Sequence, residues 1–242
     1  MPTSERTSTS DSCPHTSNAE IVQVVPVHNL LPGLLSGVAG MVDVIGYLSL
    51  GLFTAHITGN LVVIAALLVR GGPPNMAQVL AVPVFMAAVA SVWLIAKASG
   101  RRGPALTKLL LAVHFLLLAC VLVFSVIFKP AVNRHGLMAG IAAMIAVSAM
   151  GCQFALLRLA GPGAPSTAVM TGNLTSGVLA LLGTLSRGEP HIEGTKQRLK
   201  KTVELLIGFC TGSIVGAAAV SWLGPWAWSL PVALAGLAMV LR

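Results

Sequence analysis

The sequence predicts an all-α integral membrane protein with about six transmembrane helices, and three observations carry this prediction. Of the 242 residues, 55% are hydrophobic and only 9% are charged, against roughly a quarter charged in an ordinary soluble domain. The mean hydropathy is +0.87, so the apolar side chains exceed what a core of this size hides from water. Several apolar runs are also long enough to cross a bilayer. A lipid environment is therefore required.

The chain divides into a short polar tail and one long apolar region. Residues 1–26 are rich in Ser and Thr and predict a disordered N-terminal tail that lacks the features of a cleavable signal peptide. Residues 27–242 predict a single polytopic membrane domain. The six segments expected to cross are 30–53, 77–96, 109–128, 136–157, 203–223 and about 226–241. Two further segments, 54–69 and 165–185, are apolar but begin with polar residues.

These two further segments reveal an internal repeat. ITGNLVVIAALL begins at Ile57 and MTGNLTSGVLALL begins at Met170. Each follows a Gly-containing apolar span and precedes two more spans, which predicts two related halves, about 30–128 and 136–242. The stretch from Thr58 to Val69 gives about 18 Å of helix, roughly half the hydrocarbon thickness. It is therefore expected to be a discontinuous, re-entrant half-helix.

The basic residues discriminate between two topologies. If all eight segments cross, the repeats are parallel and the 15 basic residues divide 10 to 5 between the two sides. If the TGN segments enter and return, the division is 12 to 3, with only Arg70, Lys129 and Arg134 on the minor side. The positive-inside rule favours the second arrangement. The sequence thus predicts inverted repeats of three plus three spans with both termini in the cytoplasm.

The starts of the two TGN helices are the first candidate site. The N-terminus of a half-helix at membrane depth exposes unpaired N–H groups, and Thr and Asn are residue types that cap such an end or bind a solute there. Discontinuous segments at corresponding places of two halves mark the binding sites of many transporters. The alternative is that each TGN only caps its own helix and allows close backbone packing. The candidates are Thr58, Gly59, Asn60, Thr171, Gly172 and Asn173.

Asp43 is the second candidate, because it is the only acid in the middle of a predicted span. An intramembrane carboxylate is costly unless it faces protein or water, so a role in function or in polar packing is expected. Tyr47 shares its helix face, and His56 can exchange a proton near neutral pH. Gln153 occupies a similar place in the second half but does not titrate.

Other classes of function are disfavoured. The four cysteines form no CxxC pair, which predicts neither a disulfide nor a metal site, and no cofactor motif is present. No HExxH, paired acids or nucleophile beside a base points to an enzyme. The basic residues lie in short loops without interleaved aromatics, so nucleic acid is not an expected partner. Gly208, Gly212 and Gly216 predict a close-packing helix face, used either internally or in a homo-oligomer.

Two stretches carry a resemblance to a known family. GMVDVIGYLSLGLFTAHITGNLVVIA (40–65) and GCQFALLRLAGPGAPSTAVMTGNLTSGVLALL (151–182) resemble the YoaK family of bacterial multi-span membrane proteins, a domain of unknown function. The resemblance implies six spans in the bacterial inner membrane. It implies no substrate and no catalytic role, and its motif positions are Asp43, Thr58, Gly59 and Asn60.

The leading hypothesis is therefore a small-solute transporter or channel in the lipid bilayer, with a central path lined by Asp43, Tyr47, His56, Gln153 and the two TGN segments. The solute is unspecified. The alternative is a membrane scaffold whose Gly-rich faces bind a partner or a second copy.

Overall fold

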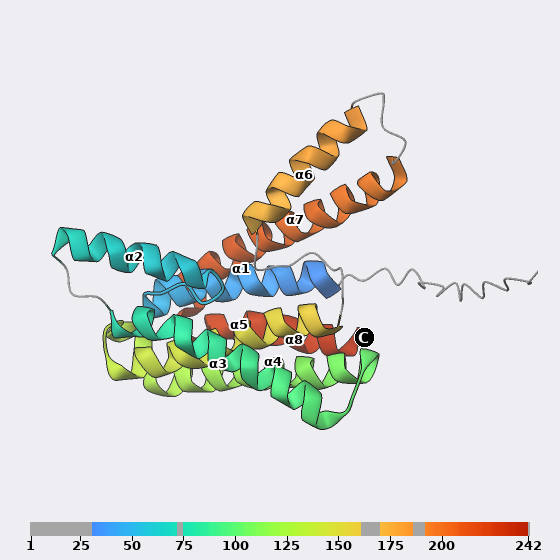
Figure 1. The fold of residues 1–242 in the computed structure, drawn as a ribbon. Helices are drawn as coiled ribbons and strands as arrows, with labels where there is room; N and C mark the ends of the chain where they lie inside the picture. The colour runs from blue at the N-terminus through green and yellow to red at the C-terminus, as the bar shows by residue number, and fades with distance from the viewer. Residues whose placement is uncertain (1–30, 72–74, 161–169, 186–191, 242) are drawn as a thin grey trace, which may run out of the picture.

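The computed structural model describes residues 31–71, 75–160, 170–185 and 192–241 (Figure 1), and the predicted N-terminal tail lies outside these ranges. Every regular element within them is helical. Two short 3₁₀ helices, η1 (Pro130–Val132) and η2 (Gly224–Trp228), join longer ones. The α-helices are α1 (Leu31–Leu50), α2 (Ile57–Arg70), α3 (Met76–Ser99), α4 (Gly103–Phe128), α5 (Leu137–Ala160), α6 (Met170–Leu185), α7 (Ile192–Leu223) and α8 (Ser229–Val240).

Helix α1 lies in the interior and contacts α5, α7 and α8. Its side chains Val38, Val42 and Ile45 are fully buried and join the main apolar core. The helix ends where Gly51 adopts a φ of +77°, a left-handed conformation that a residue with a Cβ rarely adopts. The chain can therefore turn sharply at this point.

Glycines make the contact between α1 and α7 unusually close. A Cβ on Gly212 would overlap the carbonyl oxygen of Gly37, and one on Gly208 would lie 2.5 Å from the Gly33 carbonyl oxygen. On the other helix, a Cβ on Gly40 would lie 2.9 Å from Ser213 Oγ. The Gly208/212/216 face predicted from sequence is thus used inside the chain, which answers the question left open between internal packing and oligomerisation for this face.

Helices α3, α4 and α5 pack side by side beneath α1 in Figure 1, and α8 lies against α4 and α1. A second apolar cluster, including Leu110, Leu111 and Leu156, joins α4 to α5. His114 is fully buried in this layer, with Nδ1 at 2.9 Å from the carbonyl oxygen of Ala149. His114 therefore contributes to the packing of α4 against α5.

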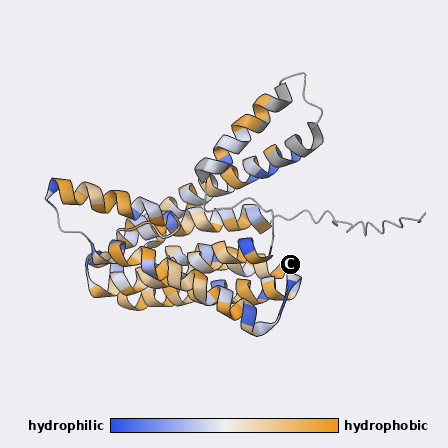
Figure 2. Ribbon diagram, in the orientation of Figure 1, coloured by the Kyte–Doolittle hydropathy of each residue, from blue (hydrophilic) through white to orange (hydrophobic). Residues whose placement is uncertain are grey.

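The described helices include five that are long and apolar enough to span a membrane. Their outer surfaces carry large apolar side chains. Figure 2 shows that hydrophobic residues occur along the whole length of the lower helices. The fifth candidate is a continuous stretch, Leu199–Val240, that joins α7 to α8. The predicted segment 226–241 corresponds to η2 and the short α8. Trp228 of η2 is buried in the core, whereas Trp222 and Trp226 are exposed.

Candidate functional site at the start of α2

The connection between α1 and α2 turns back along α1 instead of leaving the bundle. Thr54 Oγ1 donates to the carbonyl oxygen of Val42 at 2.9 Å. Gln78 Nε2 of α3 donates to the Gly51 carbonyl oxygen at 3.0 Å. A Cβ on Gly46 would lie 2.6 Å from Thr54 Cγ2, so a glycine is needed for this approach. As a result, α2 starts beside the second half of α1 and not at its end.

Asp43 holds the start of α2 through three contacts. Its Oδ1 accepts hydrogen bonds from the main-chain N–H groups of Ala55 at 2.7 Å and His56 at 3.2 Å. Its Oδ2 lies 2.7 Å from His56 Nδ1. His56 is the N-cap residue of α2, and its own side chain makes no capping hydrogen bond. The carboxylate, supplied by another helix, thus binds the two residues that immediately precede α2, close to the positive end of that helix.

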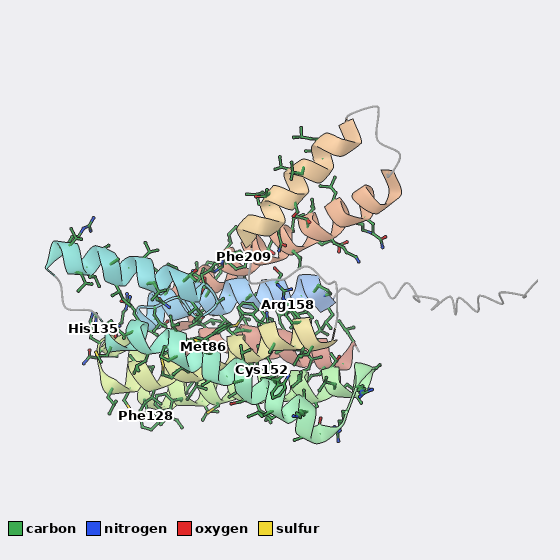
Figure 3. All side chains as sticks on the ribbon, in the orientation of Figure 1. Met86, Phe128, His135, Cys152, Arg158 and Phe209 are labelled. Atoms are coloured by element: carbon green, nitrogen blue, oxygen red, sulfur yellow. The ribbon has the colours of Figure 1, made fainter. Side chains whose placement is uncertain are left out.

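His56 is the titratable partner at this corner. The side chain is 36% exposed, and the ring meets Phe209 of α7 edge-on with centroids 5.2 Å apart. Figure 3 shows Phe209 where α7 crosses α1. The arrangement can hold a proton on an imidazole that is only partly covered by other residues of the chain.

Asn60 fixes the shape of the connection instead of capping its own helix. Its Oδ1 accepts from the Phe53 N–H at 2.9 Å, and its Nδ2 donates to the Phe53 carbonyl oxygen at 2.8 Å. The Phe53 ring stacks on Tyr47 with centroids 4.7 Å apart. A Cβ on Gly59 would lie 3.1 Å from this ring, so the glycine makes room for Phe53.

The structure thus brings five of the predicted residues to one corner: Asp43, Tyr47, His56, Gly59 and Asn60. Thr58, the second residue of α2, is exposed. Gln153 is fully buried on α5, where its Nε2 donates to the Leu35 carbonyl oxygen at 2.8 Å, two helical turns from Asp43.

The second TGN segment begins α6. Gly172 is exposed and Asn173 is buried, while the side chain of Thr171 lies outside what the structure describes. Helix α6 contacts α7, as α2 contacts α3. In Figure 1 the two helices run outward in opposite directions. Of the segment that precedes α6, residues 161–169 lie outside the described ranges, so a counterpart of the Asp43 corner is not described.

Comparison with known proteins assigns the chain to a family. A family model with the description "Protein of unknown function (DUF1275)" matches residues 31–241. The chain belongs to this family. It is also similar to the UPF0700 transmembrane protein YoaK of Bacillus subtilis (strain 168), with 30% identity over 197 residues that cover 79% of this chain and 83% of the relative. No solved structure matches. The resemblance to the YoaK family is therefore confirmed, and the DUF1275 chain is a helical membrane protein.

The sequence did not reveal every residue at the Asp43 corner. Phe53 and Phe209 are apolar residues in apolar surroundings, so nothing in the sequence distinguishes them from lipid-facing side chains. Thr54 lies between α1 and the TGN motif, and its hydroxyl was the one signal available. Within the described ranges, no group of three or more His, Cys, Asp or Glu side chains could hold a metal ion.

Proposed function

We propose that this DUF1275 protein is a small-solute transporter whose path runs past the corner of Asp43, Tyr47 and His56. The observation that carries the proposal is the 2.7 Å pair between Asp43 and a partly exposed His56 at the start of a short helix. Intramembrane ionisable residues that reach solvent commonly belong to substrate or proton pathways.

The path of the chain supports a re-entrant segment. The 20 residues of α1 give about 30 Å of helix, and Asp43 lies about 18 Å from its first residue. Because Asp43 binds the main chain of Ala55 and His56, α2 starts at this depth. The 14 residues of α2 then run about 21 Å toward the side on which α1 ends at Leu50. Helix α2 is thus a half-helix that enters and leaves on one side.

The pairing of helices supports inverted repeats. Helix α1 of the first half packs on α7 of the second, and α5 of the second half packs on α3 of the first. Likewise α2 contacts α3 as α6 contacts α7, and α4 contacts α5 as α8 contacts α1. In Figure 1, α1 and α5 run in opposite directions. Exchange of the two halves therefore preserves the contacts, as expected of six spans built from inverted repeats.

The ends of the bundle differ in charge. The end formed by the α3–α4 connection and the end of α5 carries Lys97, Arg101, Arg102, Lys108 and Arg158. The opposite end carries Arg70, Lys129 and Arg134. By the positive-inside rule, the first end faces the cytoplasm of a bacterial cell and both termini lie on that side of the inner membrane.

The proposed mechanism couples solute movement to a proton on His56. With the imidazole protonated, the ion pair with Asp43 holds the start of α2 against α1. When His56 loses the proton, the buried carboxylate of Asp43 keeps only two main-chain N–H donors and a neutral imidazole as partners. The attraction between α1 and the start of α2 is then weaker. Binding of a solute at the half-helix N-terminus can then be linked to protonation.

A flux assay tests the proposal. Purified protein is reconstituted in proteoliposomes, and charge movement is recorded on a supported membrane for a panel of inorganic anions, carboxylic acids, amino acids and cations under an imposed pH gradient. At least one solute should give a current with the wild type, and Asp43→Asn and His56→Gln should reduce it about tenfold or more.

Ser91→Ala is the matched control, because Ser91 is exposed on α3 and bonds only its own helix. Unchanged flux in a folded, inserted Asp43→Asn variant would overturn the proton-coupled mechanism. If no solute moves with the wild type, the transporter proposal fails and the scaffold alternative is favoured.

A further inference from the structure

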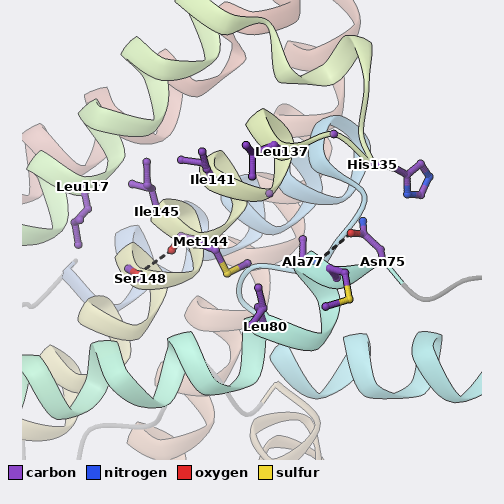
Figure 4. Close-up of a pocket in the computed structure, with 13 residues that line it drawn as sticks. Asn75, Ala77, Leu80, Leu117, His135, Leu137, Ile141, Met144, Ile145 and Ser148 are labelled. Atoms are coloured by element: carbon purple, nitrogen blue, oxygen red, sulfur yellow. Dashed lines mark hydrogen bonds between the residues drawn. The ribbon is translucent and has the colours of Figure 1, made fainter.

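A cavity lies outside the Asp43 corner. It has a volume of about 880 Å³ and lies between the first turns of α3, the middle of α4 and the first half of α5 (Figure 4). None of the residues predicted to line the solute path is among its lining residues. The volume is in the range of sites that bind small molecules in proteins.

The length of the cavity matches one leaflet of a bilayer. On α5 its lining extends from Leu137, the first residue of the helix, to Ser148, a distance of about 17 Å. On α4 the lining residue Leu117 lies about the same distance from the helix end at Phe128. The hydrocarbon region of one leaflet is about 15 Å thick. The cavity thus runs from the bundle end to its mid-depth.

The lining changes from polar to apolar along this length. Asn75 and His135 lie at the end of the bundle, as Figure 4 shows, whereas Leu117 and Ile145 lie toward its middle. The hydroxyl of Ser148 at the deep end already donates to the Met144 carbonyl oxygen at 2.8 Å. A molecule with a polar head and an apolar chain fits this gradient.

Basic residues at the polar end of the cavity indicate which kind of polar head group can bind there. The connection between α4 and α5 exposes Lys129, Arg134 and His135. The sequence contains no Asp or Glu between residues 44 and 188, so no acid on α3, α4, α5 or their connections offsets these groups. Basic residues near a membrane surface attract anionic lipid heads.

We propose that the cavity is a binding site for an anionic phospholipid of the surrounding leaflet. One acyl chain lies between α3, α4 and α5, and the phosphate lies at the Arg134–His135 connection. The lipid fills a space between helices that would otherwise lack packing partners, because van der Waals contact rather than exclusion of water stabilises such interfaces in a membrane.

Native mass spectrometry of the full chain in detergent tests the proposal. The probes are phosphatidylglycerol and phosphatidylcholine with the same palmitoyl and oleoyl chains. The wild type should retain one phosphatidylglycerol in preference to phosphatidylcholine. A Cβ on Gly140 meets nothing within 4 Å, so Gly140→Phe places a ring in the cavity. Retained lipid should then fall to about a fifth or less, because a close-packed site does not hold both groups.

Ala90→Phe, at an exposed position of α3 outside the cavity, is the matched control and should retain the lipid. Arg134→Gln alters only an exposed connection and should reduce the preference for phosphatidylglycerol about fivefold. Full lipid retention by a folded Gly140→Phe variant, or equal loss in Ala90→Phe, would overturn the site. An unchanged preference in Arg134→Gln would overturn the role of the charged connection.

Discussion

The contacts α1–α7 and α3–α5, which correspond to each other in the proposed repeat, differ in chemistry. Between α1 and α7, glycines on both helices let the backbones touch. Between α3 and α5, a Cβ on Gly151 would lie 3.0 Å from the Cβ of Ala88, which gives a looser contact. The polar residues differ as well, since α1 carries Asp43 and α5 carries Gln153.

The comparison shows why, among the described residues, a titratable pair forms on α1 and not on α5. Asp43 can bind His56 and the Ala55 N–H because the connection folds back on α1, and α1 is held in place by its close contact with α7. Gln153 makes one hydrogen bond to a helix carbonyl, so it joins α5 to α1 without a proton to exchange. Rigid packing and a polar corner therefore support each other on one helix.

The largest expected effect comes from the α1–α7 contact. In Gly212→Leu, the new side chain meets the backbone of Gly37, and backbone cannot move aside as a flexible side chain can. We expect a loss of about 3 kcal/mol or more in the free energy of unfolding, at the upper end of overpacking penalties. Thermal unfolding in detergent, followed by circular dichroism, measures it.

Gly140→Leu is the control for that substitution, because a Cβ at Gly140 meets open space. The removal of a helical glycine should there stabilise the protein by up to about 1 kcal/mol. Equal destabilisation by Gly212→Leu and Gly140→Leu would show that the close backbone contact between α1 and α7 is not the cause of the loss.

The polar corner should give the next largest effect. Asp43→Leu leaves the buried N–H of Ala55 without its acceptor and removes the partner of His56, so we expect a loss of about 3 kcal/mol. Gln153→Leu removes one hydrogen bond to Leu35 and should cost about 1 kcal/mol. Denaturation of both variants in the same detergent compares them. Similar losses of unfolding free energy in Asp43→Leu and Gln153→Leu would contradict the proposed difference between Asp43 on α1 and Gln153 on α5.

These two sites also show what sequence can predict. Low charge and long apolar runs sufficed for a helical membrane protein, because a bilayer leaves few other solutions. Asp43 and the TGN motif were found because polar residues are costly in such surroundings. The stacking of Phe53 on Tyr47 and the buried position of Trp228 were not found, because the facing of an apolar side chain depends on tertiary packing. A helix in a membrane is apolar both on the side that meets lipid and on the side that meets protein. Hydrophobic periodicity therefore gives little information about which way an apolar side chain points.

The stability of the corner should depend on pH. His56 and Asp43, 2.7 Å apart, form an ion pair only while the imidazole carries its proton. The contribution of this ion pair to stability is therefore lost as pH rises and the imidazole is deprotonated. The melting temperature should therefore fall as pH increases from about 6 to 9. His56→Gln should flatten this profile, and a profile that rises in this range would contradict the ion pair.

Thr58 should give the smallest effect and separates stability from function at the TGN motif. Its neighbour Asn60 is fully buried and binds Phe53 twice, whereas Thr58 is exposed. Thr58→Ala should change the free energy of unfolding by less than about 0.5 kcal/mol, while Asn60→Ala should cost about 2 kcal/mol. If Thr58 contacts a solute at the start of α2, its alanine variant should lower flux in proteoliposomes without a change in melting temperature. Unaltered flux would limit the role of the motif to the fold, with Asn60 as its essential member.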